Sequence, residues 1–158
     1  MQPGTPSRPI VVVDDNPDDL FFFQRYLAKA SVPNPLLIAS DGEEAIAALH
    51  ALAGPTVART SKPLVVFIDL KLPRVTGFAV LEWIRRQRGL DAVPVAVLSS
   101  SEEERDVRRA YALGAQTYLV KPPILPELLA VIEAANLFAK APLVDFGTLS
   151  LPGIPSPN

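Results

Sequence analysis

The chain has 158 residues, of which 49% are hydrophobic and 20% are charged, with a formal net charge of −2 and no cysteine. This composition suits one domain with a real core and a short extension. The lack of cysteine excludes disulfide bonds, a thiol nucleophile and a thiolate metal site. The slightly negative charge argues against nucleic-acid binding, which needs a basic surface. Because we find neither a signal peptide nor an apolar run near the roughly 20 residues of a membrane span, we expect a cytoplasmic protein with no membrane contact.

Short apolar segments alternate with helical patterns along the chain. Segments rich in Val, Ile and Leu predict five buried strands, at residues 9–13, 35–39, 64–68, 93–98 and 116–120. A predicted helix follows each strand, at about residues 17–30, 41–52, 77–88, 100–113 and 126–140. Capping boxes mark two of the helix starts: Asp41 with Glu44, and the pair Ser100 and Ser101 with Glu103 and Glu104.

Five strand–helix units in succession predict an α/β fold. Apolar strands joined by crossover helices require a parallel sheet that is covered on both faces. At this length we expect a doubly wound, flavodoxin-like sheet of five strands in the order 2-1-3-4-5, with five helices. The domain spans residues 8–140, and a Pro-rich tail occupies residues 141–158.

Polar residues follow the predicted strands at the points where the strands end. Asp14 and Asp15 follow the first strand, Asp69 follows the third, Ser99 the fourth and Lys121 the fifth. The carboxyl ends of parallel strands meet at one edge of the sheet, where such folds place their sites. Each residue alone is most often a turn, a helix cap or a solvated side chain. Their coincidence at successive strand ends predicts one shared cleft.

The chemistry of this cleft follows from its charges. Three neighbouring carboxylates are unfavourable without a compensating cation, and an all-oxygen ligand set suits Mg²⁺. A metal ion, the ammonium group of Lys121 and the hydroxyl of Ser99 around one aspartate favour attack by a carboxylate on a phosphoryl group.

The chain resembles the receiver domain of two-component response regulators. The resemblance covers nearly the whole chain, from about residue 10 to 140, and is carried by the segments VVVDDNPDD, FIDLKLPRVTGFAVL, PVAVLSSSEEE and GAQTYLVKPP. It implies that Asp69 is the phosphoacceptor and that Lys121 contacts the phosphoryl oxygens. It also implies that Asp15, Asp69 and the backbone carbonyl of Lys71 bind Mg²⁺ directly, while Asp14 positions a metal-bound water.

The same resemblance implies a conformational switch. Ser99 occupies the position of the switch hydroxyl and Tyr118 that of the switch aromatic, and a cis Lys121–Pro122 bond is expected. Gly77 fits a close or unusual backbone path after the phosphoacceptor. The chain departs from the family where Ser100 follows Ser99, because Ala is common there, and Lys71 and Ser101 occupy positions that tune the phosphoryl lifetime.

Aromatic residues suggest contacts beyond the domain. On a helical wheel one core-facing stripe of the first helix contains Phe22, Phe23, Tyr26, Leu27 and Ala30. Phe21 points away from this stripe and, with Leu137, Phe138 and Phe146, is a candidate interface residue. The FFFQRYL segment and the tailed single-domain layout are similar to the small receivers that serve bacterial phytochromes. This likeness implies a sensor histidine kinase as phosphodonor and a homodimer with contacts from the tail.

We therefore expect a single-domain response regulator, a phosphoacceptor signalling protein more than an enzyme. Two alternatives stay open. One is a pseudo-receiver that acts as a dimeric scaffold without phosphorylation, against which the complete set of polar residues argues. The other is a Mg²⁺-dependent phosphohydrolase, against which the lack of a cap insertion and a substrate pocket argues.

Overall fold

The computed structural model describes residues 7–140, and the predicted tail, including Phe146, lies outside them. Five strands alternate with five α-helices. The strands are β1 (Ile10–Val13), β2 (Leu36–Ala39), β3 (Val65–Ile68), β4 (Val95–Ser99) and β5 (Thr117–Val120). The helices are α1 (Pro17–Lys29), α2 (Gly42–Ala53), α3 (Gly77–Arg86), α4 (Glu104–Ala112) and α5 (Leu125–Lys140), and a 3₁₀ turn, η1, spans Arg59–Ser61.

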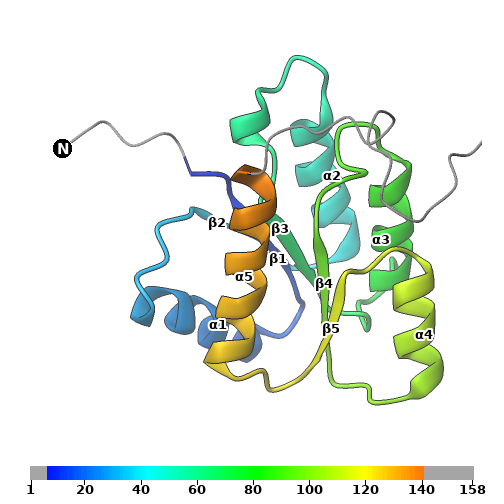
Figure 1. Ribbon diagram of the computed structural model, residues 1–158. Helices are drawn as coiled ribbons and strands as arrows, with labels where there is room; N and C mark the ends of the chain where they lie inside the picture. Colours follow the sequence, from blue (N-terminus) through cyan, green and yellow to red (C-terminus); the bar gives the residue numbers. More distant parts are fainter. Residues whose placement is uncertain (1–6, 141–158) are drawn as a thin grey trace, which may run out of the picture.

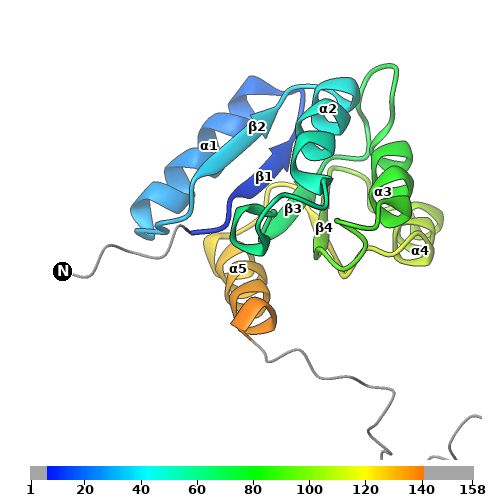
Figure 2. The same ribbon diagram turned by 90° about the horizontal axis from the view of Figure 1, so that it is seen from above.

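The strands form one sheet in the order β2-β1-β3-β4-β5, and every neighbouring pair is parallel. Helices α1 and α5 cover one face of the sheet, and α2, α3 and α4 cover the other (Figures 1 and 2). The prediction of a doubly wound, flavodoxin-like fold with five helices is therefore confirmed.

The central strands are buried on both faces, which explains why their sequences are apolar up to Ser99 at the end of β4. Every residue of β1, β3 and β4 is buried. In β1, Val11 and Val13 pack against the α2–α4 layer, whereas Ile10 and Val12 pack against α1 and α5. Burying each such side chain contributes on the order of 1.5–3 kcal/mol. The two apolar layers hold the carboxyl ends of the strands in register.

The predicted start of α4 is wrong. The capping boxes placed it at Ser100 or Ser101, but α4 begins at Glu104, after an N-cap residue, Glu103, whose side chain makes no capping bond. The reason is that Ser101 is buried and its hydroxyl bonds Asp106, at 2.7 Å between the two oxygens. By contrast, the Asp41 side chain caps α2 as predicted, with 2.7 Å to the Glu44 amide nitrogen.

The predicted core stripe of α1 is wrong at one position. Phe23 and Leu27, one turn apart, are buried, and the Phe23 ring meets the Phe67 ring of β3 edge-on at 5.0 Å between centroids. Phe22, however, is 53% exposed, because it lies about 100° around the helix from Phe23 and packs against Phe21 instead.

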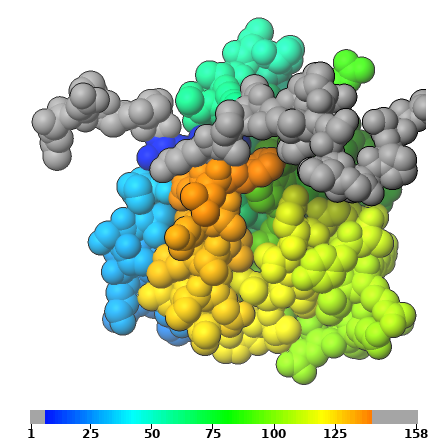
Figure 3. All heavy atoms as spheres, viewed as in Figure 1, coloured from blue at the N-terminus to red at the C-terminus, as the bar shows by residue number. Residues whose placement is uncertain are grey.

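Several large apolar side chains lie on the surface. Phe21 is exposed, as predicted, and so are Leu137 and Phe138 in the last turns of α5. Figure 3 shows α5 (orange) on the outer surface, between the blue segment that includes α1 and the yellow segment that includes β5. Within residues 7–140, no helix has both the length and the apolar character that crossing a membrane requires.

Candidate functional site

The end of β1 and the start of α1 form one tightly bonded turn. The first carboxylate oxygen of Asp14 accepts the amide of Asn16 at 2.9 Å. The Asn16 side chain in turn caps α1 by accepting the amide of Asp18 at 2.9 Å, and Pro17 occupies the first helical position. Asp14 is buried at this turn, and the next residue, Asp15, is exposed. The turn thus places one carboxylate in the cleft and one at its rim.

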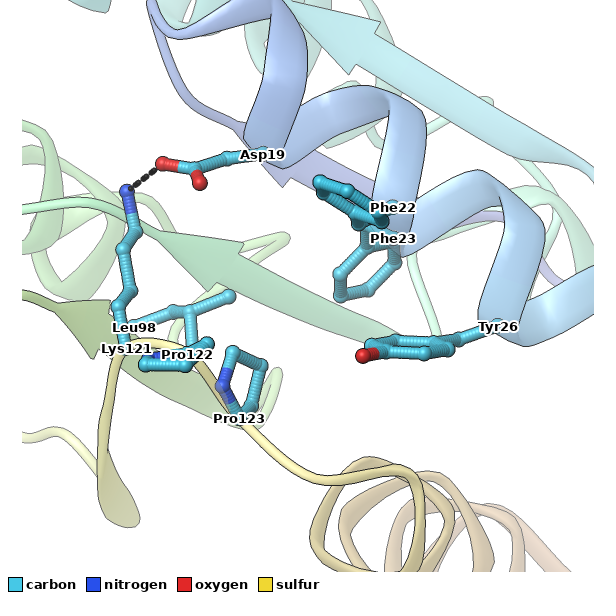
Figure 4. Close-up of a pocket in the computed structure, with 8 residues that line it drawn as sticks. All are labelled: Asp19, Phe22, Phe23, Tyr26, Leu98, Lys121, Pro122 and Pro123. Atoms are coloured by element: carbon cyan, nitrogen blue, oxygen red, sulfur yellow. Dashed lines mark hydrogen bonds and ion pairs between the residues drawn. The ribbon is translucent and has the colours of Figure 1, made fainter.

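Lys121, directly after β5, contacts three carboxylates of the cleft. Its ammonium nitrogen lies 2.7 Å from Asp14, 2.8 Å from Asp19 and 2.9 Å from Asp69, measured to one carboxylate oxygen of each. Figure 4 shows the Asp19–Lys121 pair at the mouth of a pocket beside α1. The structure therefore brings together Asp14, Asp69 and Lys121 as the sequence predicted. It adds Asp19, which we did not predict.

The pKa values of these groups follow from burial and pairing. Burial raises the pKa of Asp14 above its ordinary value, although its bonds to Lys121 and to the Asn16 amide act in the opposite direction. Burial alone would lower the pKa of Lys121. Its hydrogen bonds to Asp14, Asp19 and Asp69 outweigh that effect and raise the pKa above its ordinary value. The lysine is therefore cationic throughout the physiological range.

The residues present fit a divalent cation. Asp14, Asp15 and Asp69 each offer a carboxylate oxygen, and these three oxygens lie within 4.8 Å of one another. Lys121 is a single positive charge that bonds three carboxylates, Asp14, Asp19 and Asp69, while Asp15 adds a fourth negative charge nearby. The cluster keeps an excess of negative charge and offers only oxygen ligands, a set that suits Mg²⁺ or Mn²⁺.

The loop after β3 is built closely around Asp69. The Asp69 carboxylate oxygen that does not contact Lys121 accepts the amide of Lys71 at 3.2 Å. The amide of Gly77 donates to the Leu70 carbonyl at 3.0 Å, and a Cβ atom on Gly77 would lie 2.1 Å from the Asp69 carbonyl oxygen. The prediction of a close backbone path at Gly77 is confirmed, since only a residue without a side chain allows this approach.

The expected switch residues lie on β4 and β5, the two strands that lead to Lys121. Ser99 is fully buried at the end of β4, and its carbonyl accepts the amide of Lys121 at 2.8 Å. Tyr118 is half-buried, and its hydroxyl donates to the carbonyl of Ser101 at 2.8 Å. The Lys121–Pro122 peptide bond is cis, as the resemblance implied.

A pocket of about 200 Å³ opens beside the cleft, between α1 and the start of the β5–α5 loop (Figure 4). Its lining is mainly aromatic and apolar: Phe22, Phe23, Tyr26, Leu98, Pro122 and Pro123, with Asp19 and Lys121. Since Lys121 belongs to both, a group that enters this pocket reaches the edge of the carboxylate cluster.

A parallel five-stranded sheet with acidic residues, a hydroxyl and a lysine at the carboxyl ends of its strands defines a receiver-type signalling protein. Residues 10–133 match the response regulator receiver domain family, and the chain belongs to that family. Its main function is that of a response regulator of two-component systems. Receiver domains are signalling proteins, not classical enzymes; they are phosphorylated by histidine kinases and bind Mg²⁺ at an aspartate cluster of this kind.

The chain is similar to several single-domain response regulators. It is 30% identical over 135 residues to response regulator Rcp1 of Synechocystis sp. (strain ATCC 27184 / PCC 6803 / Kazusa), covering 85% of this chain and 90% of that protein. A structure of the Mn²⁺-bound form of Rcp1 matches with a TM-score of 0.66 and 29% identity, over 92% of this chain and 99% of that one.

Two further similar structures are those of phytochrome response regulators. The bacteriophytochrome response regulator AtBRR has a TM-score of 0.69 and 35% identity, over 88% of this chain and 98% of that chain. The phosphorylated cyanobacterial phytochrome response regulator RcpA has a TM-score of 0.67 and 32% identity, over 84% and 93%.

Proposed function

We propose that this receiver accepts a phosphoryl group from a histidine kinase on Asp69. One observation supports this assignment most strongly. Asp69 is a buried carboxylate in contact with Lys121, and its oxygens lie close to those of Asp14 and Asp15. A nucleophilic carboxylate with fixed positive charge beside it and metal-ligating oxygens around it is the arrangement that phosphoryl transfer requires.

The transfer exchanges one bond to phosphorus for another. A carboxylate oxygen of Asp69 attacks the phosphorus of a phosphohistidine, a P–O bond forms, and the P–N bond breaks with its electron pair returning to the imidazole. Lys121 then pairs with a phosphoryl oxygen, since it already lies 2.9 Å from the reacting carboxylate. The buried Ser99 hydroxyl donates a hydrogen bond to another phosphoryl oxygen.

We propose Mg²⁺ as the cofactor, held by Asp15, Asp69 and the carbonyl of Lys71, with Asp14 binding through water. When bound, the ion neutralises the charge that develops on the phosphoryl oxygens. The oxygen ligands of the carboxylate cluster and the Mn²⁺-bound form of Rcp1 support this proposal. Autophosphorylation from small phosphodonors, and hydrolysis of the aspartyl phosphate, follow from the same chemistry.

We propose a phytochrome-type sensor kinase as the phosphodonor. The likeness to Rcp1, AtBRR and RcpA supports this choice. Phe21 and Phe22 are exposed on α1, and the pocket that Phe22 lines opens towards Lys121. An apolar helix of the kinase docked on these rings would bring its phosphohistidine to the cleft, and burying both rings would favour the complex.

We also propose that residues 8–140 form the receiver domain and that residues 141–158 form an arm that contacts a second copy. The exposed Leu137 and Phe138 near the end of α5 support a homodimer at this end of the helix, and we place Phe146 of the arm in the same interface. Light-scattering masses test the arm. A dimeric full chain and a monomeric chain ending at Lys140 would support it, and two monomers would refute it.

Intact mass spectrometry tests the proposed phosphorylation. The protein is incubated with acetyl phosphate in Mg²⁺ or in EDTA, beside Asp69→Ala. We expect one phosphoryl adduct that needs Mg²⁺ and is lost in the variant. No adduct, even with candidate kinases, would favour the scaffold reading. Continued release of phosphate from many substrates would favour the phosphohydrolase.

A further inference from the structure

Ser101, in the loop between β4 and α4, uses each of its polar groups to join a different part of the switch. Its amide donates to the hydroxyl oxygen of Ser99 at 3.2 Å. Its carbonyl accepts the hydroxyl of Tyr118 at 2.8 Å. Its hydroxyl donates to a carboxylate oxygen of Asp106 at 2.7 Å and accepts the amide of Glu103 at 3.3 Å. Ser101 thus joins both expected switch residues to the first turn of α4.

The contact with Asp106 is a capping box with a hydroxyl inserted in it. In an ordinary capping box the side chain of the third helical residue bonds the amide of the N-cap residue directly. Here Asp106 is the third residue of α4, and the Ser101 hydroxyl lies between its carboxylate and the amide of Glu103. The side chain of the N-cap residue, Glu103, makes no capping bond, so this bridge takes the place of the missing cap at the start of α4.

We propose that Asp106 is a positioning residue for the switch, acting through the Ser101 hydroxyl. It fixes the backbone of Ser101, whose amide and carbonyl then hold Ser99 and Tyr118 in their resting positions. This proposal rests on the proposed phosphorylation of Asp69 and deepens it, because it names the group that couples α4 to that event.

The hydrogen-bond geometry gives the consequence. The hydroxyl oxygen of Ser99 accepts from Ser101, so its proton stays available for a phosphoryl oxygen. If Ser99 turns towards the phosphoryl group, its bond to Ser101 weakens, and the change passes to Tyr118 through the carbonyl of the same residue. Without the Asp106 bond, the Ser101 hydroxyl keeps only its contact with the Glu103 amide, and motion at Ser99 no longer displaces Tyr118 in a defined direction.

Fluorine NMR of the full chain tests the proposal. The chain has three tyrosines, so 3-fluorotyrosine labelling gives three resonances, and Tyr118→Phe identifies that of Tyr118. The resonance is recorded before and after phosphorylation with acetyl phosphate and Mg²⁺. We expect Asp106→Ala to shift the resting resonance and to reduce the phosphorylation-induced change at least twofold. Asp106→Asn, which keeps an acceptor oxygen for the Ser101 hydroxyl, should retain the wild-type response.

The matched control is Glu102→Ala, which removes an exposed acid from the same loop. It should leave both the resting resonance and the response unchanged. Ser101→Ala should reproduce Asp106→Ala, and the double variant should be no worse than either single one. An unchanged Tyr118 resonance in Asp106→Ala would overturn the proposal, as would equal effects of Asp106→Ala and Glu102→Ala.

Failure of the proposed phosphorylation gives a different result. In that case the wild type shows no mass adduct, and the resting resonance alone decides whether Asp106 positions Tyr118. An adduct in every variant with no difference in the Tyr118 resonance would refute only the role of Asp106.

Discussion

Replacing Lys121 by Met removes the charge that compensates the carboxylate cluster while keeping much of the side-chain volume. In the wild type the ammonium nitrogen contacts Asp14, Asp19 and Asp69 at 2.7, 2.8 and 2.9 Å. The side chain of Asp14 is 4% exposed and that of Asp69 is 9% exposed, so water compensates neither of them well.

The magnitude follows from this burial. Removing one partner of a buried ion pair costs about 3–5 kcal/mol, because the other charge is left uncompensated. The side chain of Asp19, the third partner, is 36% exposed, so water compensates its charge and keeps the cost near the lower end of this range. We therefore expect Lys121→Met to lose about 3 kcal/mol, at the lower end of that range, in EDTA near neutral pH. At a urea slope of about 2 kcal/mol per M, the unfolding midpoint falls by roughly 1.5 M.

Urea unfolding monitored through Trp83, the single tryptophan, measures this loss. Mg²⁺ should recover part of the stability of Lys121→Met, because a bound cation replaces the missing charge. The control is Lys29→Met, an exposed lysine of α1, which should change the stability by less than about 0.5 kcal/mol. If Lys121→Met is as stable as the wild type in EDTA, or if Mg²⁺ has no effect on it, the electrostatic account of the cleft is wrong.

Three further changes test other parts of the account. Folding raises the pKa of Asp14, so protonation of Asp14 should stabilise the metal-free protein at acid pH, and this stabilisation should be lost as the pH rises through the folded pKa. Between about pH 4 and about pH 7, the urea midpoint of the wild type should therefore fall more than that of Asp14→Asn. Gly77→Ala should lower the free energy of unfolding by about 1–3 kcal/mol and slow phosphorylation, because its Cβ would lie 2.1 Å from the Asp69 carbonyl oxygen. The control is Gly54→Ala, whose Cβ would have its nearest contact at 3.7 Å, and equal urea midpoints of the two variants would contradict this reasoning. The Phe21 ring is 55% exposed and is proposed to dock on the kinase, so Phe21→Ser should slow phosphotransfer from the cognate kinase but not from acetyl phosphate. Equal slowing with both donors would argue against docking at α1.

The fold could be predicted because its signals are local and repeated. Strands buried on both faces must be apolar at successive positions, and β1, β3 and β4 show this pattern except for Ser99 at the end of β4. The cleft could be predicted for the same reason. Once the sheet is parallel, the residues that follow its strands share one edge, and Asp14, Asp69 and Lys121 meet there.

Residues outside the strand ends were harder to place. Asp19 lies within the first turns of α1, so its approach to Lys121 depends on how the Asn16 cap and the packing of Phe23 set the rotation of that helix. Its place in the DDNPDD segment was the available signal. Phe22 was misplaced because a helical wheel treats neighbouring aromatics as one face, whereas α1 buries only Phe23 of this pair.

The prediction of where α4 starts failed for a related reason. Capping boxes are recognised by a spacing of three residues, but Ser101 bonds a carboxylate five residues along the chain. Choosing between Glu104 and Asp106 as its partner requires the path of the loop. That path depends on the contacts of Ser101 with Ser99 and Tyr118, which only the folded chain brings together.

The most direct test of the central claim is to locate the phosphoryl group on the chain. The protein is phosphorylated with acetyl phosphate and Mg²⁺ and then reduced with borohydride, which converts an aspartyl phosphate to homoserine, and its peptides are sequenced by mass spectrometry. We expect homoserine at position 69 alone. Homoserine at position 14 or 15, or at none of the three positions while the intact protein carries the adduct, would contradict it.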